Sequence, residues 1–113
     1  MATETLMKHQ SFDEKRGYPR YGMVVIAPSA ANEAYTVGLK DGIKYLSLDG
    51  TSYTVTVTLP DEASSAGREI CGYIADVSAA VLLKASDGTT TVLTGAVGPF
   101  RMVCDGTTWL QFG

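Results

Sequence analysis

Four Asp-Gly pairs punctuate this chain of 113 residues, at 41–42, 49–50, 87–88 and 105–106. Glycine accepts the positive φ that a tight turn requires, and aspartate tolerates it, so each pair predicts a turn. The segments between the turns are short and apolar, and none of ten or more residues follows the 3.6-residue period of a helix. The sequence therefore predicts an all-β fold.

The stretch 53–59 is the clearest strand, because apolar residues and threonines alternate along it. Its apolar face consists of Tyr53, Val55, Val57 and Leu59. Further strands are expected at 23–27, 35–39, 43–48, 69–75, 80–85, 90–94, 100–104 and 108–112. Asp41-Gly42 is expected to join two of them, 35–39 and 43–48, in a two-residue hairpin. We expect the strands to form a small antiparallel β-sandwich or barrel-like module.

The composition limits the size and the partners of this fold. A chain of this length can build one hydrophobic core. Hydrophobic residues make up 45% of it and charged residues 19%, an apolar excess that favours a partner or self-association. The net charge of −3 argues against a nucleic-acid partner, which would require a basic face. No apolar run is long enough to span a bilayer, and the N-terminus lacks a signal-peptide pattern, so we expect neither a membrane partner nor export.

Residues 1–22 differ from the β-domain expected at 23–113. They hold seven of the 21 charged residues, together with the only histidine, His9, and they lack apolar periodicity. Such a segment cannot form a core by itself, yet its aromatic residues exceed what a solvated tail needs. We interpret it as an extended N-terminal arm that binds a partner, and a disordered terminus is the alternative. The residues expected to make the contacts are Phe12, Lys15, Arg16, Tyr18, Arg20 and Tyr21.

No catalytic, metal or cofactor site is expected. The single histidine lies outside the β-domain, where it cannot be positioned beside a nucleophile. Asp61, Glu62 and Glu69, or the aspartates of the four Asp-Gly pairs, could hold calcium, but turn-forming aspartates and solvated loop acids are the simpler interpretation. Cys71 and Cys104 lie in expected strands, and Cys104 shares a face with Phe100 and Met102. Two buried reduced thiols are therefore expected, with a disulfide between them as the alternative.

Two motifs in the second half of the chain carry a family resemblance. They are LPDEASSAGREI at 59–70 and FRMVCDGTTWLQF at 100–112. This order resembles a β-module of bacteriophage fibre, tail-spike and head-decoration proteins, in which an "LP-x-AS-x-x-G-x-x-I" loop precedes a "V-x-L-x-x-DGT-x-W" closing hairpin. The resemblance covers residues 53–113. The stretch 76–84 departs from it, because it is more apolar than the corresponding strands of fibre tips.

The resemblance implies a homotrimer whose chains close a common core, and a virion protein assembled in the host cytoplasm. The residues expected in the fold or trimer core are Tyr53, Val55, Val57, Leu59, Phe100, Met102 and Trp109. We expect a non-enzymatic capsid decoration or cement protein, bound to the major capsid protein or another virion protein. The alternatives are a short tail-fibre or tail-spike module that binds a host-surface glycan or receptor, and a bacterial enzyme-associated β-domain. The chain lacks heptads and repeats of a fibre shaft, which favours decoration.

Overall fold

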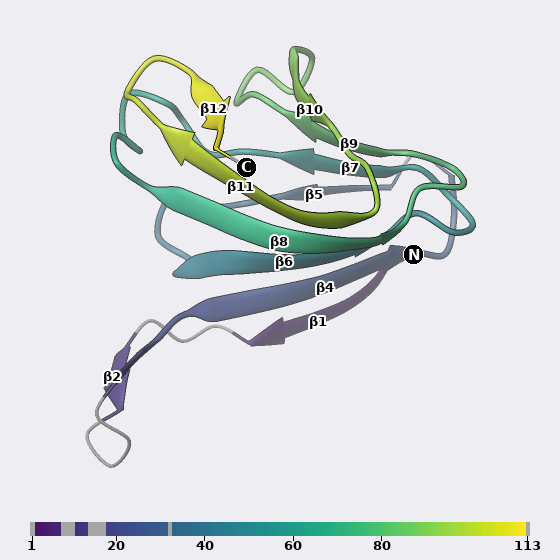
Figure 1. Cartoon of the computed structure of the whole chain (residues 1–113), viewed down its shortest axis with the longest axis horizontal. Coiled ribbons are helices and arrows are strands. Elements are labelled where there is room, and N and C mark those ends of the chain that lie inside the picture. Colours follow the sequence, from purple (N-terminus) through teal and green to yellow (C-terminus); the bar gives the residue numbers. More distant parts are fainter. Residues whose placement is uncertain (1, 8–10, 14–17, 32, 113) are drawn as a thin grey trace.

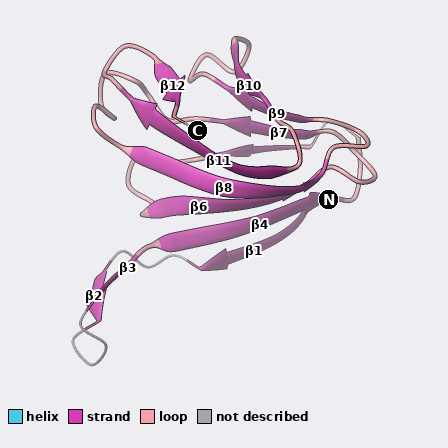
Figure 2. Ribbon diagram, viewed as in Figure 1, coloured by secondary structure: helices cyan, strands magenta, loops and turns pink. Residues whose placement is uncertain are grey.

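The computed structural model describes residues 2–7, 11–13, 18–31 and 33–112, and in this part of the chain all regular structure is β. Two sheets face each other and form the two-layer body in Figures 1 and 2. The larger sheet has the order β1 (Ala2–Met7), β4 (Gly22–Pro28), β6 (Ile43–Asp49), β8 (Glu69–Asp76), β11 (Gly98–Cys104), β12 (Trp109–Gln111). The smaller sheet has the order β10 (Thr91–Thr94), β9 (Val81–Lys84), β7 (Val55–Thr58), β5 (Ala34–Thr36). The prediction of an all-β fold is confirmed.

From β4 to β9 the chain changes sheet at every strand. As a result β4, β6 and β8 lie parallel in the larger sheet, and β5, β7 and β9 lie parallel in the smaller one. Parallel neighbours require a crossover connection, and here each crossover is a strand of the opposite sheet. Antiparallel strands follow at the borders, where β1 pairs with β4, β10 with β9, and β11 with both β8 and β12. The body is therefore a short coil of three turns with antiparallel strands at every sheet edge except β5, which pairs parallel with β7.

The expected antiparallel pairing is wrong for the centre of both sheets, which are mixed. Asp41-Gly42 does not make the expected hairpin, because the strands on either side of it, β5 and β6, belong to different sheets. The Asp41 carboxylate instead accepts hydrogen bonds from the backbone N–H groups of Gly38 (2.6 Å) and Ile43 (2.9 Å). These bonds hold a wider turn that passes the chain across to the other layer. The later pairs, 87–88 and 105–106, do join antiparallel neighbours.

Gly50 shows why an Asp-Gly pair suits a corner of this coil. Its N–H donates to Asp76 O (2.8 Å), and its carbonyl accepts from the N–H of Ala79 (2.8 Å), so the corner between β6 and β7 stacks on the corner between β8 and β9. A Cβ at this position would lie 2.8 Å from Ala80 O. The missing side chain is therefore what allows two successive turns of the coil to approach each other.

The core lies between the two layers and receives alternate residues from both sheets. β4 has a strictly alternating burial pattern, with Val24 and Ile26 inside, and β7 contributes Val55 and Val57 in the same way. The buried apolar set is Val24, Ile26, Val37, Ile43, Leu46, Leu48, Val55, Val57, Leu59, Ile70, Ile74, Val81, Leu83, Leu93, Phe100, Met102, Cys104 and Trp109. One continuous core of this size agrees with a single domain.

The N-terminal segment contributes one strand to the body and a small hairpin outside it. β1 pairs with the full length of β4, from Ala2 opposite Pro28 to Met7 opposite Met23. β2 (Ser11–Asp13) and β3 (Tyr18–Arg20) pair only with each other, and Figure 1 shows β2 beyond the start of β4, away from the two layers. Nowhere in the described ranges is there a helix that could cross a membrane.

Candidate functional site

A cavity of about 400 Å³ opens where β4, β6 and β8 begin. The loop between β5 and β6 forms one wall, the residues that enter β8 form another, and Tyr21 closes the side next to the N-terminal hairpin. Its lining consists of Tyr21, Leu39, Lys40, Gly42, Ile43, Lys44, Gly67, Arg68 and Glu69. Three of these side chains are cationic and one is anionic, in a chain whose net charge is −3.

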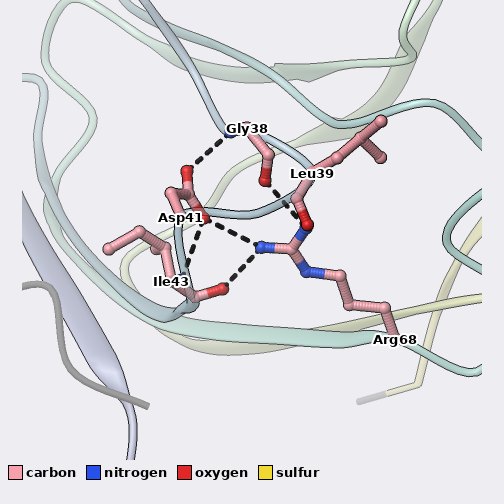
Figure 3. A network of polar contacts seen from close by, with 5 residues as sticks. All are labelled: Gly38, Leu39, Asp41, Ile43 and Arg68. Carbon is pink, nitrogen blue, oxygen red and sulfur yellow. Dashed lines mark hydrogen bonds and ion pairs between the residues drawn. The ribbon is translucent and has the colours of Figure 1, made fainter.

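Arg68 fixes the wall of this cavity, as Figure 3 shows. Nη1 of its guanidinium donates to the carbonyl oxygens of Gly38 (2.9 Å) and Leu39 (3.4 Å). Nη2 donates to Ile43 O (2.9 Å) and lies 3.2 Å from the Asp41 carboxylate. A planar guanidinium can satisfy several acceptors at once, so one side chain holds the whole turn. Both Nη atoms of Arg68 therefore donate to the turn, where a ligand in the cavity would otherwise accept from them.

A ladder of three charged side chains crosses the larger sheet beside the cavity. Glu69 on β8 accepts from Arg101 on β11, and its other oxygen lies 3.2 Å from Nζ of Lys44 on β6. Hydrogen bonds from Arg101 and then from Lys44 hold the pKa of Glu69 below its ordinary value. Nζ of Lys44 also lies 4.6 Å from the ring centre of Tyr21 and 5.7 Å from that of Tyr45. Such cation–π contacts link the ladder to the aromatic residues on both sides of it.

The outward surface of the larger sheet continues from this ladder and is mostly apolar. We call it the outer sheet face, and it consists of Met23, Val25, Tyr45, Ser47, Glu69, Cys71, Tyr73, Pro99, Arg101, Val103 and Leu110, with Lys44 at its border. Tyr45 is 40% exposed and Tyr73 is 54% exposed. A shallow groove of about 280 Å³ separates the two tyrosines, above Ser47 and Gly72. This face is the most aromatic exposed surface in the described part of the chain.

Of the six residues expected to bind a partner from the arm, only Tyr21 has a described side chain. It lines the cavity and packs edge-on against Tyr45, with ring centres 6.3 Å apart. Phe12 lies in β2, and Tyr18 and Arg20 lie in β3, where the structure describes the backbone. Lys15 and Arg16, like His9, lie outside the described residues.

The residues expected in the fold or trimer core differ in their burial within one chain. Val55, Val57, Leu59, Phe100, Met102 and Trp109 are buried within the single chain. Tyr53 instead lies before the start of β7 and is 37% exposed, because β7 begins two residues later than expected. Tyr45 and Tyr73 lie in strands, and within one chain they too remain exposed.

The two motifs of the family resemblance contact each other directly. The indole N–H of Trp109 donates to Pro60 O (3.1 Å), inside the protein. Backbone bonds add to this contact, from the N–H of Gly67 to Cys104 O (2.8 Å) and from the N–H of Cys104 to Arg68 O (3.1 Å). The loop at 59–70 and the closing hairpin therefore form one structural unit.

The acidic residues considered for calcium have separate partners. The Asp61 carboxylate accepts from the N–H of Ser64 (3.1 Å), Glu62 binds Ser86, and Glu69 belongs to the charged ladder. No cluster of three or more metal-binding side chains occurs among the residues that the structure describes.

The cysteines are not bridged. Cys104 is buried, whereas Cys71 is half-buried on the outer sheet face, so the expectation of two buried thiols is wrong for Cys71. Burial and then the neighbouring Glu69 raise the pKa of Cys71 above its ordinary value. A thiol with a raised pKa is a poor nucleophile at neutral pH, because little of it is thiolate.

Comparisons of the chain with protein-family models, with curated proteins and with solved structures found no match.

Sequence reasoning did not find the cavity, the Arg68 clamp or the outer sheet face. The clamp joins residues about thirty positions apart, and no local motif indicates it. A signal for the outer sheet face was present, because 23–27 reads Met-Val-Val-Ile-Ala without alternation. Strands that are covered on both faces have such uninterrupted apolar sequences.

Proposed function

We propose that this protein is a non-enzymatic structural component of a bacteriophage virion, a homotrimer that decorates or cements the capsid. The observation that carries the proposal is the contact between the loop at 59–70 and the hairpin that contains Trp109. The resemblance to phage modules rests on these two motifs, which are some thirty residues apart in the sequence. Their contact supports the interpretation that they act as one module.

Attachment to the particle occurs through the N-terminal arm and the neighbouring end of the β-body. Tyr21 supports this assignment, because it belongs to the arm and also lines the cavity. An aromatic residue next to Lys40 and Lys44 is typical of the anchors that dominate protein interfaces. The partner is the major capsid protein or another virion protein, which presents acidic groups to this end of the molecule.

A second candidate function is a short tail-fibre or tail-spike module that binds a host-surface glycan. The groove between Tyr45 and Tyr73 favours it, since both rings are exposed on the same face of the sheet. Aromatic faces stack on the apolar faces of sugar rings, and hydroxyl groups beside them supply hydrogen bonds. Binding of the protein to purified heads without tails, or to tails without heads, separates the two functions.

The proposal is tested with particles that lack the protein. A triple variant, Phe12→Ala with Tyr18→Ala and Tyr21→Ala, removes the three aromatic residues of the arm and keeps β1, which pairs with β4. We expect the wild-type chain to sediment with the particles and the triple variant to remain in the supernatant as a folded protein.

The matched control is Tyr53→Ala, which removes an exposed tyrosine at a distance from the arm in the sequence. This variant should bind particles as the wild type does. Full binding of the triple variant would contradict attachment through the arm, and would point to the loops at 28–34 or 60–68. Failure of the wild-type protein to bind any virion part would contradict the proposed function.

A further inference from the structure

The two sheets differ in the surface that each turns away from the core. In the smaller sheet β7 has buried valines on one side, and on the other it presents Thr56 and Thr58. In the larger sheet β4 has Val24 and Ile26 buried, and on the other side it presents Met23 and Val25. A strand with one solvated face alternates apolar and polar residues, as β7 does, whereas β4 has the apolar sequence of a strand that is covered on both faces.

Four of the seven large hydrophobic residues that are exposed in the described part of the chain lie on or beside the outer sheet face. Tyr45, Tyr73 and Leu110 belong to the outer sheet face and are between 40% and 54% exposed, and Phe112 follows at the edge of the sheet with 54%. Monomeric proteins seldom leave contiguous apolar surface of this kind in water, and larger patches mark interaction sites. Among the residues that the structure describes, the outer sheet face is therefore a surface that gains from being covered.

The charges on this face indicate what covers it. Lys44, Glu69 and Arg101 alternate in sign across three neighbouring strands, β6, β8 and β11. A face of one sign would call for a partner of the opposite sign. An alternating ladder presents a carboxylate and cations on the same face, so copies arranged in a ring can each place the carboxylate against a cation of the next copy.

We propose that the outer sheet face is the surface through which copies of this chain associate. The inference rests on the homotrimer of the proposed function and names its contact surface. In the assembly the two tyrosines and their groove are buried against the neighbouring copy, and Glu69 also reaches a cation of that copy. The association covers the second face of the larger sheet, and the threonine face of the smaller sheet stays in water.

The test compares two arginine substitutions in the full chain. Tyr73→Arg places a charge in the centre of the outer sheet face, at a side chain that is exposed in one chain and so can change without loss of the fold. Thr94→Arg places the same charge on the exposed surface of β10, in the smaller sheet. The mass of each folded protein is measured by light scattering after size exclusion, at micromolar concentration.

We expect about three times the 12.0 kDa of one chain for the wild type and for Thr94→Arg, and 12.0 kDa for Tyr73→Arg, with the same circular dichroism spectrum for all three. Cys71 gives a second measurement, because it lies on the outer sheet face while Cys104 is buried. Its reaction with a thiol reagent should be slower in the wild type and in Thr94→Arg than in Tyr73→Arg at the same pH.

An oligomer that persists in Tyr73→Arg with Cys71 still protected would overturn the inference and leave the homotrimer in place, formed through another surface. A monomeric wild-type protein would overturn both the inference and the trimer. If such a monomer still binds virion particles, and Tyr73→Arg abolishes that binding, the outer sheet face contacts the capsid instead of a second copy.

Discussion

Single side chains join segments that are far apart in this sequence. Arg68 supplies the donors for the turn at 38–43, and Trp109 supplies one for Pro60 O. The acceptors include the carbonyls of Gly38, Leu39 and Pro60, which lie outside the strands, and a carbonyl left unpaired inside a protein costs free energy. These side chains therefore stabilise loops that sheet pairing alone would leave open.

The contribution of Trp109 can be divided into packing and hydrogen bonding. Trp109→Ala removes a buried ring and should lower the free energy of unfolding by about 3–5 kcal/mol. Trp109→Phe keeps most of the packing but leaves Pro60 O without its donor, so we expect a smaller loss of about 1 kcal/mol. Urea denaturation measures both values.

The control for these variants is Val97→Ala, at a side chain that is 59% exposed. This change should alter stability by less than about 0.5 kcal/mol. If Trp109→Ala were no more destabilising than the control, Trp109 would have no structural role in the closing hairpin.

At the scale of the elements, parallel pairing in the larger sheet depends on a close approach at Gly72. A Cβ on this residue of β8 would lie 2.3 Å from Leu46 O on β6 and 2.5 Å from the ring of Phe100 on β11. The absence of a side chain lets the Phe100 ring pack directly against Gly72. Gly72 thus allows three adjacent strands to lie close together. The pattern of apolar residues in the sequence does not indicate this role.

Gly72→Ala should therefore destabilise the protein, by about 1–3 kcal/mol as expected for an overpacked interior. Phe100→Leu in the same chain should recover only part of this loss, because the smaller side chain relieves the contact with the ring and leaves the contact with the Leu46 carbonyl. Denaturation of the wild type, both single variants and the double variant measures the coupling. An unchanged midpoint for Gly72→Ala would show that the strands are farther apart than described.

At the scale of the whole molecule, the coiled path of the chain determines which residues become neighbours. Val25 on β4 and Ser47 on β6 are paired across parallel strands, although 22 positions separate them. A hairpin at Asp41-Gly42 would have given β6 a different neighbour. The candidate cavity also depends on this path, because its walls come from the starts of strands that the coil brings to the same end.

A disulfide tests this topology. Val25→Cys with Ser47→Cys, in a Cys71→Ser background, should form a disulfide within one chain, since neighbouring strands lie about 4.8 Å apart and a disulfide joins Cα atoms about 4.4–6.8 Å apart. Val25→Cys with Thr56→Cys is the control, because Thr56 lies on the outward surface of the other sheet. Mass spectrometry without reductant should detect the bridge in the first pair alone. A bridge in the control pair would exclude the two-layer coil.

The sequence by itself determined the strands of the β-domain at 23–113 and the inward face of most of them, but not the strands β1, β2 and β3 that precede it. Alternation is a local property, so 53–59 and 100–104 could be assigned from neighbouring residues, and Val57 and Met102 are buried as expected. The turns at 87–88 and 105–106 were also local, since each joins strands that are adjacent in both sequence and space. The arm, the trimer and the virion partner remain predictions.

Only the tertiary structure decided which strands pair, and therefore where the candidate site lies. An Asp-Gly pair indicates that the chain turns, but not whether it turns back along the same sheet or across to the other layer. At 41–42 the outcome depends on Arg68 and the Asp41 carboxylate, which meet only after β8 has been added. The exposure of Tyr45 and Tyr73 was undetermined for the same reason, because the side of a sheet that a single chain covers depends on where its second sheet packs.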